Sequence, residues 1–230
     1  MTLRQQDFPQ RDFIQLNGQT NFPKQTPVNR LFPIDKIKII CYTIFEGGEI
    51  MRVISGQAGG RRLTTLEGEE VTRPTGGKVK EAIFSSIRFN LPGKTFLDLF
   101  SGSGQMAIEA VSLGASEAVA IELNRNALSV LRENVKSCGF DGKIEIRQAD
   151  AYSYLESTNK TFDIAFLDPP YRKQMIDRAL PLLVSKMSRD GIILCEISSE
   201  ESLPESCGEF VAVKRHKYSN TTVVVYKWKE

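Results

Sequence analysis

The chain has 230 residues, of which 41% are hydrophobic and 25% are charged, close to the averages for soluble globular proteins. This composition excludes a disordered, collagen-like or coiled-coil chain and suits one sizeable domain, with or without a small appendage. The formal net charge is +2, so the chain is not basic as a whole, and binding to nucleic acid would require clustered basic residues.

Cysteine and histidine usage argues against a metal site and against export. The four cysteines are Cys41, Cys138, Cys195 and Cys207. They form no C-x-x-C pair and His216 is the single histidine, so we expect no metal. The longest apolar run, Ile37 to Phe45, is too short for a transmembrane helix and lies too deep in the chain for a signal peptide. We therefore expect a soluble, cytoplasmic protein with reduced thiols and no membrane contact.

The first fifty residues differ from the rest. Residues 1–34 are rich in Gln, Asn, Pro, Thr and Phe and show no clean period, which predicts loop or disorder. Glu46 to Met51 can be encoded by a DNA string that contains AGGAGG, a bacterial ribosome-binding site, shortly before an ATG codon. We interpret residues 1–50 as an extension, either disordered or translated from a start codon set too early. A flexible hinge is the alternative for the residues just before Met51.

Residues 51–94 form an orderly lead-in. Val53–Ile54 predicts a short strand, and residues 72–77 predict a loop, because Pro and paired Gly interrupt regular structure. A helix is predicted over Lys78–Phe89 from the spacing of the apolar residues Val79, Ile83, Phe84 and Ile87.

Strands and helices alternate strictly from Thr95 onward. The predicted strands are Thr95–Phe100, Ala118–Leu123, Lys143–Arg147, Phe162–Leu167 and Gly191–Ile197. The predicted helices are Gln105–Leu113, one capped by Asn124, Ala151–Glu156 and Gln174–Met187. Two β-rich runs, Phe210–Lys214 and Thr221–Trp228, close the chain. The pattern predicts an α/β fold with a mostly parallel seven-stranded sheet, helices on both faces and an antiparallel C-terminal hairpin at one edge.

A glycine-rich loop joins the first strand of this series to its helix. Gly102, Ser103 and Gly104 allow a tight turn in which backbone amides face a ligand at a helix N-terminus. The loop alone is a weak signal, because with Ala107 it also fits the dinucleotide pattern G-x-G-x-x-A. Asp98, just before the loop, suits a cationic group and would sit poorly beside a pyrophosphate. The combination favours S-adenosylmethionine, which carries an ammonium and a sulfonium but no phosphate.

Two more carboxylates follow the next strands. Glu122 ends the second strand, where it can accept both hydroxyls of a ribose. Asp150 follows the third strand and suits an adenine amino group. Acids at three consecutive strand ends mark the edge at which such sheets bind ligands; an ordinary turn with solvated acids is the alternative. The predicted cofactor-binding residues are Asp98, Phe100, Gly102, Ser103, Gly104, Glu122, Leu123, Asp150 and Ala151.

The sequence Asp168-Pro169-Pro170-Tyr171 follows the fourth strand. Its prolines stiffen the loop and leave carbonyls free. The Asp168 carboxylate and the Pro169 carbonyl could accept the two N–H bonds of an exocyclic base amine and aim its lone pair at a methyl donor. Tyr171 could stack on a base that has left its helix. These four residues are the predicted catalytic set, and a Pro-rich turn with a surface Tyr is the alternative.

These motifs resemble the class I S-adenosylmethionine-dependent methyltransferases that modify exocyclic amines. A narrower resemblance, to the RsmD family, rests on Met51–Gln57, Gly60–Leu63, Arg73–Thr75, Lys78–Glu81 and Phe84, and it covers residues 51–230. It implies a Rossmann-like class I methyltransferase fold over residues 95–230, S-adenosylmethionine as cofactor, and methyl transfer to N2 of a guanine in small-subunit (16S) ribosomal RNA. Residues 1–50 have no counterpart in the family.

The lead-in is locally basic, with eight Lys or Arg against four Glu over residues 51–94. Phosphate contacts need such a cluster; a solvated, mixed-charge face is the alternative. The RNA-binding candidates are Arg52, Arg61, Arg62, Arg73, Lys78 and Lys80. A second basic group, Lys214–Lys217, is equally consistent with RNA contact and with a solvated surface, and His216 within it is expected to be a surface residue.

Three other functions are compatible with parts of the pattern. A DNA adenine-N6 methyltransferase shares the Asp-Pro-Pro-Tyr motif, but residues 51–230 leave little room for a target-recognition region. A nicotinamide-dependent dehydrogenase would fit the glycine loop but lacks an evident proton relay. A non-catalytic RNA-binding module would not need Asp98, Glu122 and Asp168 together. We expect a monomer that acts on 16S rRNA or on the assembling small subunit.

Overall fold

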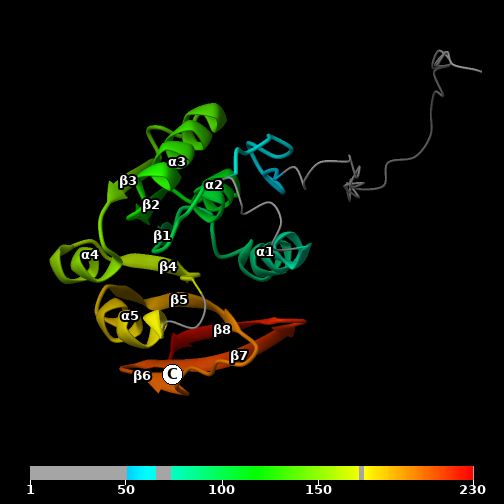
Figure 1. The fold of residues 1–230 in the computed structure, drawn as a ribbon. Helices are drawn as coiled ribbons and strands as arrows, with labels where there is room; N and C mark the ends of the chain where they lie inside the picture. Colours follow the sequence, from blue (N-terminus) through cyan, green and yellow to red (C-terminus); the bar gives the residue numbers. More distant parts are fainter. Residues whose placement is uncertain (1–50, 66–73, 171–173, 230) are drawn as a thin grey trace, which may run out of the picture. The chain divides into compact units, whose positions relative to one another are not determined.

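The structure is a computed structural model and describes residues 51–65, 74–170 and 174–229. Strands and helices alternate along these residues, and a C-terminal hairpin completes one sheet (Figure 1). The predicted extension over residues 1–50, together with Arg73 and Tyr171, lies outside the described residues.

The secondary structure follows the predicted series closely. The helices are α1 Pro74–Ile87, α2 Gln105–Ser112, α3 Arg125–Cys138, α4 Ala151–Ser157 and α5 Met175–Val184. The strands are β1 Thr95–Asp98, β2 Glu117–Glu122, β3 Ile144–Gln148, β4 Phe162–Leu167, β5 Met187–Ser198, β6 Ser206–Cys207, β7 Phe210–Tyr218 and β8 Thr221–Trp228. Asn124 caps α3 as predicted, and its side chain accepts the amides of Asn126 and Ala127.

The strands form one mixed sheet in the order β3-β2-β1-β4-β5-β8-β7-β6. Strands β1 to β5 pair in parallel, and β8, β7 and β6 add to them in antiparallel pairs. Over the described residues the sheet has eight strands, so the predicted count of seven was wrong. The extra strand, β6, has two residues and forms because the chain folds back at Gly208, whose φ of 57° is easily adopted by glycine. β6 therefore occupies the edge where the hairpin was predicted.

Helices cover both faces of the sheet, as predicted (Figure 1). Alternate strand residues point to opposite faces, and this alternation divides the core in two. On the α1 face, the sheet packs against α1, α2 and α3; on the α5 face, it packs against α4 and α5. In β8, Val223 and Val225 lie on the α1 face, whereas Val224 and Tyr226 lie on the α5 face.

Several predicted elements differ from the structure; β7, for example, runs to Tyr218 and does not end at Lys214. Helix α1 begins at Pro74, within the predicted loop, because the first turn of a helix does not need the N–H that proline lacks. Strand β5 begins at Met187, within the predicted helix, because Met187 already pairs with Phe162 of β4. Val53–Ile54 forms no strand; a single bridge between Arg52 and Arg62 closes this segment instead.

Residues 51–65 are held against α2 and α3 by buried polar groups. The Glu109 carboxylate accepts the amides of Ile54 and Ser55, with N···O distances of 2.8 and 2.9 Å. Asn134 of α3 bonds both the amide and the carbonyl of Thr64. Burial raises the pKa of Glu109 to about 7, although the two amides oppose that rise. The lead-in is thus anchored to the helices that carry the glycine loop.

Candidate active site

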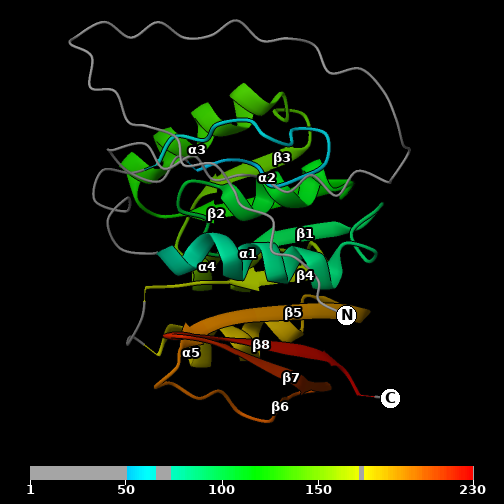
Figure 2. The ribbon, with the colours of Figure 1, turned by 90° about the vertical axis from the view of Figure 1, so that its right-hand side faces the viewer.

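The predicted site residues gather at one edge of the sheet. Strands β1 to β5 are parallel, so their carboxyl ends meet at this edge, which we call the carboxyl edge. Asp98 ends β1, Glu122 ends β2, Asp150 follows β3 and Asp168 follows β4. Helix α1 begins near this edge and runs away from it, since Lys80 at its middle reaches the first residue of α2, whereas its end leads into β1 (Figure 2).

The glycine loop has one closed and one open side. Gly104 is the N-cap of α2 with a φ of 83°, and a Cβ there would lie 2.0 Å from a methyl carbon of Leu131. Gly102 has a φ of 51°, and a Cβ there would meet no described atom within 4 Å. The loop is therefore packed against α3 at Gly104 and open at Gly102, as a loop must be to admit a ligand close to its backbone.

Glu122 braces the loop from the neighbouring strand. Its Oε2 accepts the Gly102 amide at 2.8 Å, and its Oε1 accepts the Asn124 amide at 2.7 Å. The side chain is half-buried, and Leu123 beside it is 62% exposed. Each carboxylate oxygen keeps capacity for a further hydrogen bond, because an ionised carboxylate offers about four acceptor sites. Glu122 can therefore support the loop and accept ligand hydroxyls together.

Asp98 lies buried beneath the loop, with 1% of its surface exposed. Its Oδ2 accepts the Ala107 amide in the first turn of α2 at 3.2 Å, and its carbonyl accepts the Ser101 hydroxyl at 2.8 Å. Burial raises the pKa of Asp98 from its ordinary value of 3.8 to about 7, against the opposing effects of the Ala107 amide and the positive charge of Lys80. A cation arriving here would favour the ionised form.

Lys80 belongs to this cluster rather than to an open basic surface. Its ammonium donates to the Gln105 side chain at 2.7 Å, and the Lys80 side chain is half-buried. Gln105 is the first residue of α2, so the positive charge stands beside the glycine loop. The sequence did not indicate this position, because it depends on how α1 packs against the start of α2.

Asp150 has a structural task at the third strand end. As the N-cap of α4, its Oδ1 accepts the amides of Tyr152 and Ser153, both at 3.1 Å. Ala151 next to it is buried, and Phe100 beyond β1 is half-buried and packs on the α5 face. One oxygen of Asp150, Oδ1, therefore holds the helix, and Oδ2 makes no hydrogen bond with the described residues.

The Asp-Pro-Pro turn borders a pocket of about 260 Å³. Asp168 is half-buried, Pro169 is buried and Pro170 is exposed. Both prolines line the pocket together with the acidic residues Asp177, Glu196, Glu200 and Glu201. Its carboxylates make this side of the edge suitable for a group rich in N–H donors. The sequence did not indicate the acidic lining, which comes from β5, α5 and the loop after β5.

Two of the predicted RNA-binding side chains, Arg61 and Arg52, are already hydrogen-bonded to backbone carbonyls. The Arg61 guanidinium donates to the Ser137 carbonyl at the end of α3, and the Arg52 guanidinium donates to the Gly60 carbonyl at 2.9 Å. Arg62 and Lys78 are exposed, and their side chains form no ion pair with the described residues. The bridge between Arg52 and Arg62 keeps those two backbones adjacent.

Among the residues that the structure describes, no helix is both long and apolar enough to cross a membrane. The same residues contain no group of three or more His, Cys, Asp or Glu side chains arranged to hold a metal ion.

Comparison with known proteins gives matches over most of the chain. A family model described as "Conserved hypothetical protein 95" matches residues 51–227. YlbH of Bacillus subtilis (strain 168) is 36% identical over 182 residues, which cover 77% of this chain and 98% of that protein. The ribosomal RNA small subunit methyltransferase D of Haemophilus influenzae is 30% identical over 183 residues, which cover 78% of this chain and 93% of that protein.

Solved structures give the same fold. The structure of yhhF from Escherichia coli matches with a TM-score of 0.71 at 26% sequence identity, covering 78% of this chain and 98% of that one. An RNA methyltransferase from Salinibacter ruber, solved with S-adenosyl-L-homocysteine, matches with a TM-score of 0.53 at 20% identity, covering 69% and 95%. The second likeness bears on the fold alone. Together they confirm the predicted Rossmann-like α/β architecture.

Proposed function

The chain belongs to the RsmD family of methyltransferases, and we propose that it transfers a methyl group from S-adenosylmethionine to N2 of a guanine in small-subunit (16S) ribosomal RNA. The observation that carries this proposal is the adjacency of two loops. The glycine loop leaves β1 and the Asp-Pro-Pro turn leaves β4, and these two strands are paired neighbours in the sheet. A cofactor on the first loop and an acceptor on the second would meet at the carboxyl edge.

The described residues fit S-adenosylmethionine on two counts. The glycine loop is open at Gly102, and the buried Asp98 has a raised pKa, so a cation would stabilise its ionised form. When bound, the cofactor supplies an electrophilic methyl group on a sulfonium. Asp98 would favour the ammonium of its methionine part, and Lys80 would favour the carboxylate. Glu122 would accept the ribose hydroxyls, and Asp150 would accept the adenine amine.

On the acceptor side, Asp168 and the Pro169 carbonyl would hold the amine. An exocyclic amine is a poor nucleophile because its lone pair is delocalised into the ring, and two acceptors on its N–H bonds favour a pyramidal nitrogen. The neighbouring pocket is lined by carboxylates that match the N–H donors of a guanine edge. Proton loss can then occur to Asp168 or to water.

A ribosomal RNA substrate is supported by relatives whose names state it, such as the Haemophilus influenzae protein. The exposed Arg62 and Lys78 provide positive charge for phosphates on this chain. We further propose that the protein works in the cytoplasm as a monomer, on 16S rRNA or on the assembling small subunit. Residues 51–94 would then contribute to RNA binding, and residues 95–230 would carry the transfer chemistry.

The direct test is transfer of labelled methyl from S-adenosylmethionine to purified RNA. We expect the purified protein to label small-subunit RNA from cells that lack it, and to leave large-subunit RNA from the same cells unlabelled. Digestion of the product should release the label as N2-methylguanosine. Labelling of adenosine, or of DNA in preference to RNA, would contradict the proposal.

A further inference from the structure

The β7–β8 hairpin brings its turn to the carboxyl edge. Strand β8 runs antiparallel to β5, with Thr221 opposite Ser198, the last residue of β5. Tyr218, the last residue of β7, pairs with Thr221. The turn between β7 and β8 therefore lies at the same edge as the Asp-Pro-Pro turn, with the start of α1 also toward that edge (Figure 2).

The strand register also fixes the distance between the β7–β8 hairpin and the Asp-Pro-Pro turn. Through β5 and β8, it places Leu167 of β4 level with Arg215 of β7. Asp168 follows Leu167 in the chain, so it comes level with His216. Three strand spacings separate them, a distance of about 14 Å. A polynucleotide with its target base at Asp168 could extend along the sheet to β7.

Three side chains of β7 share the α1 face of the sheet. Lys214 pairs with Val225 and His216 pairs with Val223, and both valines lie on that face. Tyr218 packs against the same core. Lys214 and His216 are exposed, and the His216 and Tyr218 rings lie 6.5 Å apart at 34°. We call Lys214, His216 and Tyr218 the hairpin face.

The charge of this hairpin is entirely positive. Residues 210–229 contain five Lys or Arg and no Asp or Glu. Arg215 pairs with Glu205 and Lys229 pairs with Glu209, which neutralises two of the five. Lys214 is exposed and forms no ion pair with the described residues. The hairpin face thus presents one positive charge without an ion-pair partner and two aromatic rings, at the same edge of the sheet as the Asp-Pro-Pro turn.

We propose that the hairpin face binds the RNA strand next to the target guanine. Lys214 contacts a phosphate, and His216 and Tyr218 provide ring surfaces for a neighbouring base, the combination by which proteins hold single-stranded RNA. This inference rests on the proposed function, because it assumes an RNA acceptor at Asp168. It adds a second RNA contact to the lead-in, and the two would flank α1.

A different role for the same charges is protection of the sheet edge. On its outer side, β7 pairs with β6 only at Phe210 and Val211, so among the described strands none covers its outer side from Val213 onward. Lysines on such an edge prevent pairing with other chains. That role predicts self-association of the variants and no change in RNA affinity.

Lys227 provides a matched control. It lies on β8 opposite Ile192, toward the amino end of β5, and it is exposed. By the alternation along β8 it shares the α1 face with Val225. Lys227→Ala therefore removes one charge from the same hairpin and face, far from the carboxyl edge.

The test measures binding of full-length 16S rRNA transcript to the full chain by filter retention over a salt series. We expect K214A/H216A to bind about tenfold more weakly, because loss of one stacked base alone is worth about 1–3 kcal/mol. Its salt slope should fall by about one, the value for one phosphate contact. Lys227→Ala should bind like wild type. A milder K214Q/H216Q pair serves if the alanine variant folds poorly, with S-adenosylhomocysteine affinity as the measure of an intact site.

Each outcome bears on one claim. Wild-type RNA affinity in a variant that retains S-adenosylhomocysteine binding would overturn the inference, and self-association in sedimentation would assign the charges to edge protection. An equal loss of RNA affinity in Lys227→Ala would also overturn the inference, since the loss would then reflect the total positive charge of the hairpin and not a specific contact. If wild-type protein methylates neither this RNA nor small subunits from cells that lack the protein, the proposed function fails instead.

Discussion

The cofactor side and the acceptor side of the carboxyl edge are built in different ways. On the cofactor side, Asp98, Glu122 and Asp150 each accept backbone amides of the loops and helices beside them. On the acceptor side, the groups are two prolines, an acidic pocket and the exposed residues of the hairpin face. Residues of the first side serve both the fold and the ligand, so their substitution should change stability and affinity together. Residues of the second side should change turnover or RNA binding with little effect on the fold.

The largest expected effect separates the two sides at Asp168. Asp168→Ala should abolish measurable methyl transfer, because it removes a charge-assisted hydrogen bond of about 1.5–3 kcal/mol and also the orientation of the amine. S-adenosylhomocysteine affinity, measured by calorimetry, should stay within about twofold of wild type. Asp168→Asn is the matched control, since it keeps the shape and one acceptor. Near-normal turnover in the alanine variant would remove Asp168 from the catalytic set.

Asp98 should show the opposite signature, a gain in stability with a loss of binding. Burial raises its pKa from 3.8 to about 7, so the ionised form destabilises the folded protein at pH 8. Without ligand, Asp98→Asn should be more stable than wild type by a few kcal/mol at pH 8, since a tenfold change in proton affinity is worth about 1.4 kcal/mol. S-adenosylhomocysteine should bind the variant more weakly.

The pH dependence gives the check on Asp98. The carboxyl binds protons more tightly in the folded chain, so wild type gains stability as the pH falls from about 7 to about 4, and the variant lacks that gain. The difference between the two should vanish by about pH 4 in denaturant titrations. Glu109 also has a pKa of about 7, but it is common to both proteins and cancels. If Asp98→Asn is less stable than wild type at pH 8, the ionised Asp98 carboxylate does not destabilise the folded protein.

Substitution of Lys80 can separate binding of the amino acid part of the cofactor from binding of its nucleoside part. Lys80→Met should weaken S-adenosylhomocysteine binding by about tenfold, because it removes the cation held on Gln105. Binding of 5′-methylthioadenosine should not change, since that ligand lacks the amino acid part. The exposed Lys78 lies two residues earlier, and Lys78→Met should alter neither affinity. An equal loss for both ligands would mean that Lys80 supports the loop instead.

The smallest expected effect comes from substitutions in the lead-in, residues 51–94. Arg62→Ala should lower the salt slope of RNA binding by about one, with unchanged affinity for S-adenosylhomocysteine. Arg61→Ala is an informative comparison, because the Arg61 guanidinium donates to Ser137 and its loss should lower the free energy of unfolding as well. If Arg62→Ala leaves the slope unchanged, the lead-in at this point is a solvated face.

The sequence predicted the frame of the site better than its details. The alternation of strands and helices placed Asp98, Glu122 and Asp168 at strand ends, and the bounds of β4 agree at both ends. Such periodic signals are local, so a single sequence carries them. The contact of Lys80 with Gln105 depends on long-range packing between α1 and α2, which leaves no periodic trace. The two-residue strand β6 is too short for any pattern.

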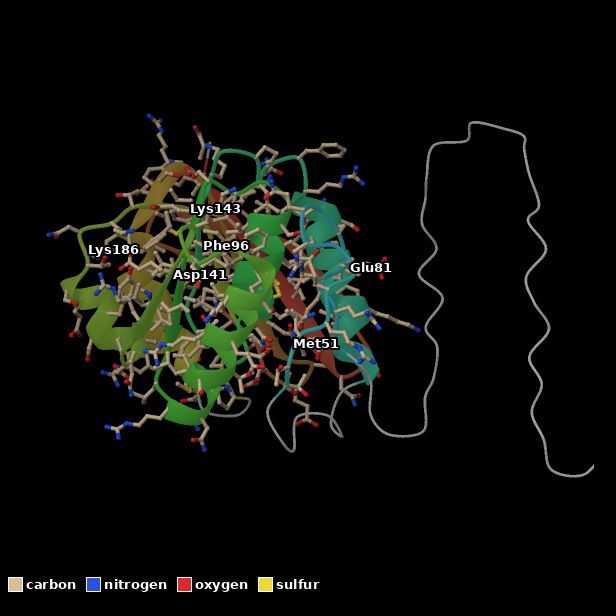
Figure 3. All side chains as sticks on the ribbon, turned by 90° about the horizontal axis from the view of Figure 1, so that it is seen from above. Met51, Glu81, Phe96, Asp141, Lys143 and Lys186 are labelled. Carbon is tan, nitrogen blue, oxygen red and sulfur yellow. The ribbon has the colours of Figure 1, made fainter. Side chains whose placement is uncertain are left out.

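The lead-in packs closely against the rest of the fold. Met51 lies against the core of the α1 face, and Glu81 lies on the outward side of α1 (Figure 3). The Ser103 hydroxyl lies 3.9 Å from the Met51 sulfur, and the Asn134 side chain donates to the Ser103 carbonyl at 2.9 Å. Asn134 sits among the apolar residues of α3 and was not singled out from the sequence, since a buried amide has no spacing of its own. The lead-in and the glycine loop are therefore coupled through shared contacts.

The central claim, methyl transfer to N2 of a guanine in small-subunit ribosomal RNA, is tested most directly by mass spectrometry of that RNA from cells with and without the protein. We predict that deletion removes one N2-methylguanosine from the RNA. The full chain should restore it, and the Asp168→Ala chain should not. An unchanged content of N2-methylguanosine after deletion would contradict the account.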